Sequence, residues 1–410
     1  MVPKGWELQV LDNLCSKIAV GLAISVTPYM KEKGVKLIRN QNIKRNRFDD
    51  SSIVYLDEDF AEQNKTKQVR AGDVIAVRTG SNIGEACSVP PEFHGALTFT
   101  TLIARPEAEL LNSEFLCLHI NSEKGVSEVN RLMAGGGKPN LNSGELKNYQ
   151  ILLPPLSEQR KIAQILSSWD KAITTTERLL SNRQQQKKAL MQRLLTGKQR
   201  FAGLEGEWCI TTLGEVFSKI TNGLTYDAKA TEGLPVTRIE TISTGVVNYV
   251  KVGWAPANEN TKRFRLQYGD ILYSHINSLE HIGRVAFYRE EYPLYHGMNL
   301  LLLRPNDKVI PEFVYYVLNS QIGKRYAKLY AKAAVNQASI STTEIKTFKI
   351  KIPNKNEQQK IASVLSAADA EITTIQNQLD NLKQQKKALM QQLLTGKRRV
   401  KVDSPALATQ

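Results

Sequence analysis

The side chains with the clearest chemical potential in this sequence lie in polar loops rich in Arg, Lys, Asn and Gln. The most pronounced loop spans residues 39–48 and reads RNQNIKRNRF. Arginine and lysine suit guanine edges and phosphate groups, while Asn and Gln amides suit adenine. We therefore take these loops as candidates for contact with nucleic acid. The candidate residues are Arg39, Asn42, Lys44, Arg45, Arg47, Arg78, Ser81, Asn82, Lys138, Asn140, Asn142, Arg238, Lys262, Arg263, Arg265, His275, Asn277, Gln337 and Ser339.

The candidate loops occur in pairs that differ in sequence. RTGSN at 78–82 corresponds to SHINS at 274–278, and GKPNLN at 137–142 corresponds to NQASIS at 336–341. Different polar loops on a common framework are what two regions reading different base sequences would need. Ordinary surface loops also diverge fastest between duplicates, so the loops alone leave both interpretations open.

Motifs for catalysis, metal binding and cofactor binding are absent from the sequence. There is no Walker A or HExxH pattern, and the glycine-rich run at 134–140 lacks GxGxxG spacing. The double-proline sites do not match the Asn/Asp-Pro-Pro-Tyr/Phe pattern of amino-methyltransferases. The five histidines have no metal-ligand spacing and the four cysteines form no CxxC pair. We expect structural histidines, reduced thiols and a chain that is not itself an enzyme and holds no metal or cofactor.

The elements that must position these loops include a long helical sequence that occurs twice. The copies span residues 158–198 and 357–397, and every match lies at an offset of 199 residues. Apolar residues recur in alternating steps of four and three, which is the seam pattern of a coiled coil. The seam residues are Ile162, Leu166, Trp169, Ile173, Leu180, Leu190, Leu194, Ile361, Leu365, Ile372, Ile375, Leu379, Leu382, Leu389 and Leu393.

Three seam positions carry cations, namely Arg183, Lys187 and Lys386. A buried cation costs stability unless it is paired. We expect these side chains to reach solvent along a frayed edge of the seam. The alternative is that they fix the register of the two helices or face a partner.

The duplication extends beyond the helices, because short motifs recur in the same order at offsets of 197–202 residues. We expect an α+β fold with two similar mixed α/β heads, separated by an antiparallel two-helix coiled coil with pseudo-two-fold symmetry. Helices are predicted at 112–133 and 311–332, and strands at 74–77, 97–104, 234–242 and 245–252. The expected divisions are a first head at 1–155, a central helix at 156–200, a second head at 201–354, a C-terminal helix at 355–398 and a disordered tail at 399–410.

Composition and charge bound the class of protein. The net charge of +15 suits a polyanionic partner, and residues 153–200 alone hold ten basic and three acidic side chains. Charge does not distinguish nucleic acid from an acidic protein or from a solvated face. The N-terminus lacks an apolar signal core and no run of about 18 apolar residues occurs, so we expect a cytoplasmic protein without membrane contact.

The repeated junctions between head and helix carry a family resemblance. They read LLPPLSEQRKIA at 152–163 and IPNKNEQQKIA at 352–362. The chain resembles the specificity (S) subunit of Type I restriction-modification systems, in which such a junction ends each target recognition domain and opens a long helix. The likeness runs from Trp6 to about Lys397. The second junction departs from the proline pattern, having Ile-Pro-Asn-Lys in place of Leu-Pro-Pro-Leu.

The resemblance implies a non-catalytic subunit that binds a bipartite asymmetric site in double-stranded DNA, with one half-site per recognition domain. It also implies two methyltransferase (modification) subunits, which bring S-adenosylmethionine, and separate restriction subunits, which use ATP with magnesium. The coiled coil would dock the modification subunits and set the spacer. A helix of about 38 residues is roughly 57 Å long, which corresponds to about 17 base pairs between the outer limits of the half-sites.

Two alternatives remain. The chain could serve a fused restriction-methyltransferase system, or it could be a coiled-coil adaptor that binds only protein. A specificity subunit should co-purify with a methyltransferase and prefer one bipartite sequence over bulk DNA. An adaptor should show no sequence preference at moderate salt.

Overall fold

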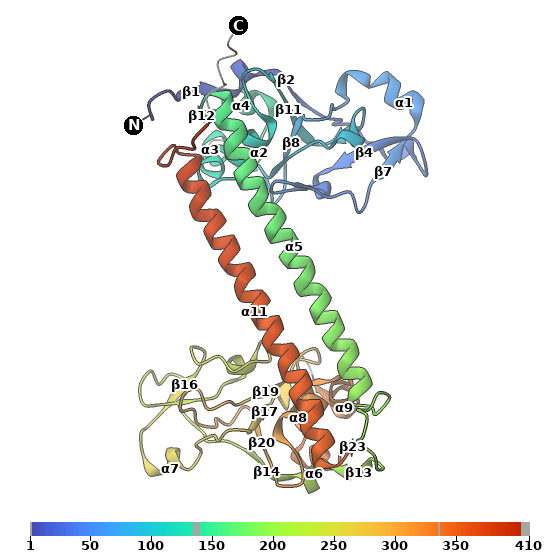
Figure 1. Cartoon of the computed structure of the whole chain (residues 1–410), viewed down its shortest axis with the longest axis vertical. Coiled ribbons are helices and arrows are strands. Elements are labelled where there is room, and N and C mark those ends of the chain that lie inside the picture. The colour runs from blue at the N-terminus through green and yellow to red at the C-terminus, as the bar shows by residue number, and fades with distance from the viewer. Residues whose placement is uncertain (1, 134–139, 335–336, 403–410) are drawn as a thin grey trace. The chain divides into compact units, whose positions relative to one another are not determined.

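The computed structural model describes residues 2–133, 140–334 and 337–402. The chain forms two compact units (Figure 1). Unit 1 comprises Met1–Glu177 with Gln378–Gln410, and unit 2 comprises Arg178–Asn377. The long helices α5 (Leu156–Leu194) and α11 (Lys355–Leu393) each contribute to both units. The predicted divisions treat each long helix as a separate segment of the chain. In the structure, one part of each helix packs in unit 1 and the other part in unit 2.

The framework of unit 1 is an antiparallel sheet in the order β2-β11-β8-β9. Its inner face, the helices that cover it and the ends of α5 and α11 form one core around Phe115 and Leu102. Strands β1 and β12 form a separate pair beside this core. The elements are β1 (Glu7–Val10), β2 (Cys15–Val20), β8 (Val74–Val77), β9 (Ala86–Ser88), β11 (Thr101–Pro106), α2 (Ser113–Ile120), α3 (Glu123–Met133), α4 (Ser143–Lys147) and β12 (Gln150–Leu153).

Unit 1 carries a second, mixed sheet in the order β10-β4-β7-β3, in which β10 and β4 run parallel. Leu37, Leu56 and Phe60 form a small core between this sheet and α1. Figure 1 shows α1, β4 and β7 gathered on one side of the framework sheet. The elements are β3 (Met30–Lys31), β4 (Val35–Arg39), β5 (Ile43–Lys44), β6 (Arg47–Phe48), β7 (Val54–Leu56), α1 (Glu58–Gln63) and β10 (Leu97–Phe99).

Unit 2 repeats the framework with the order β14-β20-β17-β19 and the pair β13-β23. In place of the mixed sheet, the described part of unit 2 has the pair β15-β16, together with a small sheet in the order β18-β22-β21. The elements are β13 (Cys209–Thr212), α6 (Leu213–Val216), β14 (Phe217–Asn222), β15 (Leu234–Val236), β16 (Gly253–Ala255), α7 (Glu259–Lys262), β17 (Ile271–Tyr273), β18 (Ile276–Asn277), β19 (Val285–Phe287), β20 (Leu301–Pro305), α8 (Pro311–Asn319), α9 (Gln321–Tyr330), β21 (Lys332–Ala334), β22 (Gln337–Ser339), α10 (Thr342–Lys346) and β23 (Lys349–Ile352).

Several predicted elements differ from the observed ones. The helices predicted at 112–133 and 311–332 are each interrupted, at Asn121–Ser122 and at Ser320, where a serine hydroxyl accepts a backbone N–H bond at the start of the next helix. The strand predicted at 245–252 is wrong, because that segment consists of turns that lead into β16. Gly245 and Asn248 are turn residues, and the Asn248 side chain accepts the N–H groups of Val250 and Lys251, which outweighs the strand preference of the β-branched valines.

Within each unit, part of α5 runs antiparallel to part of α11 (Figure 1). In unit 1 the Lys383 ammonium lies 2.8 Å from Glu177, and in unit 2 the Arg183 guanidinium lies 2.9 Å from Glu371. None of the predicted apolar seam residues is exposed. Among the described residues, no helix combines the length and apolarity needed to cross a bilayer.

The seam lysines contradict the expectation that they reach solvent. Lys386 is 8% exposed, and its ammonium lies 2.5 Å from the Asp170 carboxylate of α5. Lys187 pairs in the same way with Asp369 of α11. The partner carboxylates flank the seam on the opposite helix, so the charges of buried Lys386 and half-buried Lys187 are both compensated.

Candidate nucleic-acid interface

An ion pair fixes the framework strand that precedes the polar loop in each head. Arg105 donates to both carboxylate oxygens of Asp73 at 2.8 Å, and Asp73 also accepts the Arg70 backbone N–H. The hydrogen bonds from Arg105 to this carboxylate raise the pKa of the guanidinium above its usual value. Gly72 adopts φ +83°, a conformation that favours glycine. The recurring Gly-Asp and Arg-Pro motifs therefore anchor the start of β8.

Unit 2 contains the same anchor. Arg304 donates to both oxygens of Asp270 at 2.7 Å, and Gly269 adopts φ +89°. Asp270 is 1% exposed, so this pair is part of the folded framework. The two heads thus hold the strand before their second polar loop in an equivalent way.

Contacts with one another or with the framework strands hold the candidate loops of the first head. The Arg45 guanidinium lies 3.1 Å from the Glu85 carboxylate, and the Asn46 N–H donates to the Ala86 carbonyl at 3.0 Å. Thr79 forms a β-bridge with Asn140. Loop 39–48 therefore packs against the start of β9, while loops 78–82 and 140–142 pair with each other after β8. The three loops, each held at the β8-β9 side of the framework sheet, make up the loop cluster.

The sequence reasoning missed two asparagines that hold this cluster. Asn46 adopts φ +57°, and its side-chain oxygen accepts a bond from the Asn121 amide at 2.7 Å. The Asn121 amide also donates to the carbonyls of Ala86 and Cys117. Asparagine tolerates the left-handed region better than other residues that carry a side chain. An asparagine between two arginines at 45–47 could therefore have been predicted to form a turn.

The candidates of the first head fall into three classes. Arg45, Arg47, Ser81 and Asn82 are exposed, whereas Arg39, Lys44, Arg78 and Asn140 are half-buried. Lys138 lies outside the described residues. The remaining two, Asn42 and Asn142, serve the fold.

Asn42 and Asn142 of the predicted contact set form hydrogen bonds within the fold. Asn42 is 1% exposed, and its side chain bonds to the Arg39 N–H and the Asp49 carbonyl. Asn142 caps α4 by accepting the Glu145 N–H at 2.9 Å, and Glu145 accepts the Asn142 N–H in return. Asparagine is favoured in such turns and caps for the same hydrogen-bonding reason that it suits adenine, so the sequence could not separate the two roles.

The candidates of the second head form two groups. His275, Asn277, Gln337 and Ser339 lie on or beside the sheet formed by β18 and β22, where Ile276 pairs with Ser339. Lys262, Arg263 and Arg265 lie at the end of α7 and just after it, and Arg265 forms a β-bridge with Tyr295. Tyr295 also bridges Val236 of β15, two residues before Arg238. The second group is therefore built on the β15-β16 side of the head.

Most of the charged candidates in the second head are paired with acids. Lys262 lies 2.8 Å from Glu259 and Arg265 lies 3.4 Å from Glu290. Arg238 is half-buried and lies 3.5 Å from Glu240. By contrast, Gln337 and Ser339 are exposed. His275 is 8% exposed, and burial lowers its pKa to about 4, so the imidazole is neutral near pH 7.

The Glu-Gln pairs of the two junctions have structural roles that the sequence did not reveal. Glu158 accepts two bonds from Arg399 at 2.7 Å and one from the Trp6 indole at 3.1 Å. Gln159 accepts the Asn112 N–H, which fixes the chain before α2. The disorder expected for 399–410 does not apply to Arg399, while residues 403–410 lie outside the described part.

Unit 2 repeats this arrangement at its own junction. Glu357 is fully buried and accepts two bonds from Arg200, at 3.0 and 2.7 Å. Gln358 accepts the Ile310 N–H before α8. The start of each long helix is thus tied both to its head and to the segment that follows the end of the other helix.

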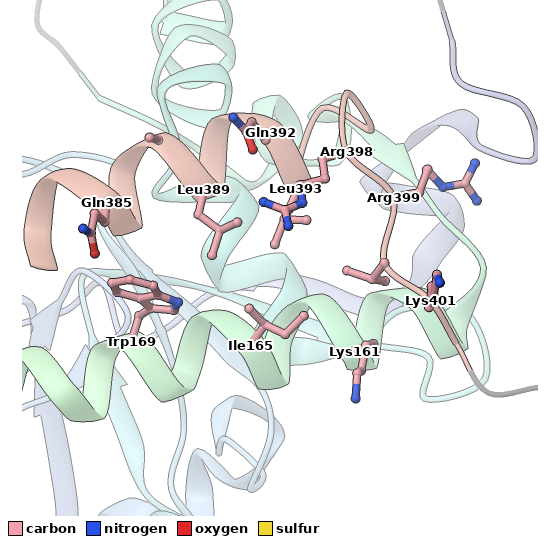
Figure 2. A pocket seen from close by; sticks show the side chains of 12 residues that line it. Lys161, Ile165, Trp169, Gln385, Leu389, Gln392, Leu393, Arg398, Arg399 and Lys401 are labelled. Atoms are coloured by element: carbon pink, nitrogen blue, oxygen red, sulfur yellow. The ribbon is translucent and has the colours of Figure 1, made fainter.

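Unit 1 also contains a groove of about 860 Å³ between α5 and α11. Figure 2 shows Trp169 and Ile165 of α5 facing Leu389 and Leu393 of α11. Arg398 and Lys401 lie at the end of the groove, and Lys161 lies on the α5 side. The floor is therefore apolar and one end is basic.

Comparison with known families gives a consistent result. The profile described as the Type I restriction modification DNA specificity domain matches the chain twice, at residues 3–182 and 205–384. A protein of Methanocaldococcus jannaschii assigned as the MjaX specificity subunit is 43% identical over 204 residues, which is 48% of this chain and 48% of that protein. The chain thus spans about half of that relative. The EcoKI specificity subunit of Escherichia coli K12 is 23% identical over 400 residues, covering 93% of this chain and 85% of that protein.

Solved structures show the same fold. The S subunit of a Type I system from M. genitalium superposes with a TM-score of 0.61 at 15% identity, covering 95% of this chain and 96% of that chain. A chain from a Type I restriction-modification assembly gives a TM-score of 0.57 at 20% identity, covering 97% and 100%. The predicted fold class, with two mixed heads and two long helices, is confirmed.

Proposed function

Because the chain belongs to the Type I restriction-modification DNA specificity family, we propose that each head reads one half of a bipartite, asymmetric site in double-stranded DNA. The chain is a specificity subunit and not the catalytic component. The observation that carries the proposal is the pair of equivalent frameworks bearing different polar loops. In the first head these loops form one cluster, which includes exposed Arg45, Arg47 and Asn82.

The long helices would dock two modification subunits and set the spacer between half-sites. Support comes from the continuity of α5 and α11, each of 39 residues, and from the residues that each contributes to both units. The apolar groove with a basic end is one surface suited to such a partner. S-adenosylmethionine would be bound by the modification subunits, and ATP with magnesium by restriction subunits. The chain itself would supply sequence selection.

The test is sequence-selective binding by the complex with its modification subunits. Methylome sequencing of an expressing host should return one bipartite motif, and the purified complex should bind that motif at least 1,000-fold more tightly than scrambled DNA. Scrambling either half-site alone should abolish most of this preference. Binding without sequence preference at moderate salt would refute DNA reading and favour a protein adaptor.

A pair of variants tests the loop cluster itself. Arg47→Gln removes an exposed cation from the first head, so affinity should fall and the slope of log K against log salt should shrink by about one. Lys4→Gln removes an exposed cation from the N-terminal segment and serves as the matched control, with both quantities unchanged. Equal effects of the two variants would remove the loop cluster from the DNA interface.

A further inference from the structure

Sheet register identifies Arg78 and His275 as equivalent positions in the two heads. Ala104 pairs with Val74 in the first head, and Leu303 pairs with Ile271 in the second, each one residue before the anchoring arginine. Counting four residues on from Val74 and from Ile271 gives Arg78 and His275. The alignment of loop 78–82 with loop 274–278 must therefore be shifted by one residue, so that Arg78 corresponds to His275 and not to Ser274.

A second contact supports this equivalence. The Leu141 N–H donates to the Arg78 carbonyl at 3.1 Å, and the Ile340 N–H donates to the His275 carbonyl at 2.9 Å. The residue before each donor, Asn140 or Ser339, lies opposite the residue after Arg78 or His275. Arg78 and His275 therefore occupy the same position in an equivalent backbone pairing, beside Leu141 in the first head and Ile340 in the second.

Both equivalent side chains keep hydrogen-bonding capacity that no described residue uses. The Nε of Arg78 and the Nδ1 of His275 are buried nitrogens without a hydrogen-bond partner, and so is the side-chain oxygen of Asn140. Buried polar groups in folded proteins nearly always have partners. The ion pairs Arg105–Asp73 and Arg304–Asp270 fix the start of the strand that leads to each position, so both positions follow equivalent framework strands.

The surroundings of these positions are polar in both heads. Ser81 and Asn82 are exposed beside Arg78, and Gln337 is exposed on the strand that carries Ser339. Arg45, by contrast, already pairs with Glu85. Arg78 thus has an Nε donor without a partner, whereas Arg45 of the same head is compensated.

We propose that positions 78 and 275 are the equivalent base-contacting positions of the two heads. Arg78 would contact a base edge in one half-site, and His275 would contact a base edge in the other. This inference rests on the proposed function and assigns specificity to particular residues. Arginine donates through a planar fork that matches the O6 and N7 acceptors of guanine.

The chemistry of histidine predicts a difference between the heads. A neutral imidazole has one donor nitrogen and one acceptor nitrogen, whereas the guanidinium has five donors. His275 should therefore contact one atom of a base edge, while Arg78 contacts two. Discrimination between bases at the position that His275 contacts should therefore be weaker than at the position that Arg78 contacts.

The experiment compares Arg78→Lys and His275→Asn in the complex with its modification subunits. Affinity is measured for the wild-type motif and for every single-base change in both half-sites. Arg78→Lys should reduce discrimination at one position by about 5- to 150-fold, the range for a bidentate base contact. The half-site read by the second head provides the internal control and should be unaffected. His275→Asn should relax one position in the other half-site by a smaller factor.

Other outcomes separate the inference from the proposed function. Unchanged discrimination in both half-sites, with a wild-type complex that is selective, would overturn the inference and leave the proposed function standing. A uniform loss of affinity at all sequences would assign Arg78 to phosphate contact and also overturn it. A lower melting temperature with unchanged discrimination would assign a purely structural role, with the same consequence. A wild-type complex without sequence preference would refute the proposed function itself.

Discussion

The seam lysines offer a quantitative test of how the two helices are held together. In unit 1, Lys386 is nearly buried and pairs with Asp170, whose side chain is 35% exposed. Exposed ion pairs contribute roughly 0.2–1 kcal/mol, whereas removing one member of a fully buried pair costs roughly 3–5 kcal/mol. Lys386→Met keeps the length of the side chain and leaves a half-buried carboxylate without its cation. We expect the free energy of unfolding to fall by about 2 kcal/mol.

Unit 2 provides the matched control because its aspartate has a second partner. Tyr316 donates to Asp369 at 2.7 Å, and this bond survives the loss of Lys187. The residue at the equivalent place in unit 1 is Leu118, 198 positions earlier, which offers no hydroxyl. Lys187→Met should therefore cost about 1 kcal/mol, less than Lys386→Met.

Urea unfolding of the single variants and of the double variant Lys386→Met with Asp170→Leu measures these costs. The double variant should recover most of the stability, because an apolar pair replaces a buried ion pair without leaving a lone charge. Hydrogen exchange of peptides from 156–177 and 378–393 would localise the effect to unit 1. A cost for Lys187→Met equal to or greater than that for Lys386→Met would refute the reasoning.

Three further predictions follow from burial, backbone conformation and helix length. Burial lowers the pKa of His119 to about 4, below its unfolded value near 6.5. The neutral imidazole therefore contributes to stability above pH 6.5, and this contribution is lost as pH falls towards 4. His119→Gln should reduce the dependence of the urea unfolding midpoint on pH over that interval. Gly396 and Gly197 both adopt left-handed conformations, at φ +68° and +70°. An added Cβ would lie 2.4 Å from a proline side chain at Gly396, but 3.5 Å from the nearest atom at Gly197. Gly396→Ala should therefore lower the melting temperature more than Gly197→Ala. Deleting one heptad from each helix, at 175–181 and 374–380, should shorten the spacer in the methylome motif by about 3 base pairs without altering either half-site, and an unchanged spacer would contradict the role of the helices in setting it.

The sequence predicted best the features that repeat along one element. The apolar seam follows from heptad spacing, because the period of an α-helix alone decides which side chains share a face. The partners of the seam lysines could not be predicted in that way. Asp170 and Asp369 flank the seam on the opposite helix, and their proximity to the lysines depends on antiparallel register.

The candidate contact residues show where local chemistry is ambiguous. Asn42 and Asn142 were predicted to contact DNA because they are asparagines, but asparagine is also favoured in turns and helix caps. Arg78 and His275 were also selected by type, but their equivalence required the sheet register. A one-residue error in aligning two loops hides a matched position, because neighbouring strand residues point to opposite faces.

The spacing between equivalent residues shows where the two copies have changed. The offset is 202 residues from Trp6 to Trp208, 197 from Gly72 to Gly269, and 199 from Glu158 to Glu357. The chain has therefore lost and gained residues within the segments that build the mixed sheet and the polar loops of each head. The helices kept one offset throughout, since any insertion other than a whole heptad would move every later seam residue off the buried face. Recognition of two independent half-sites at a fixed spacing would require loops that can change in length and helices that cannot.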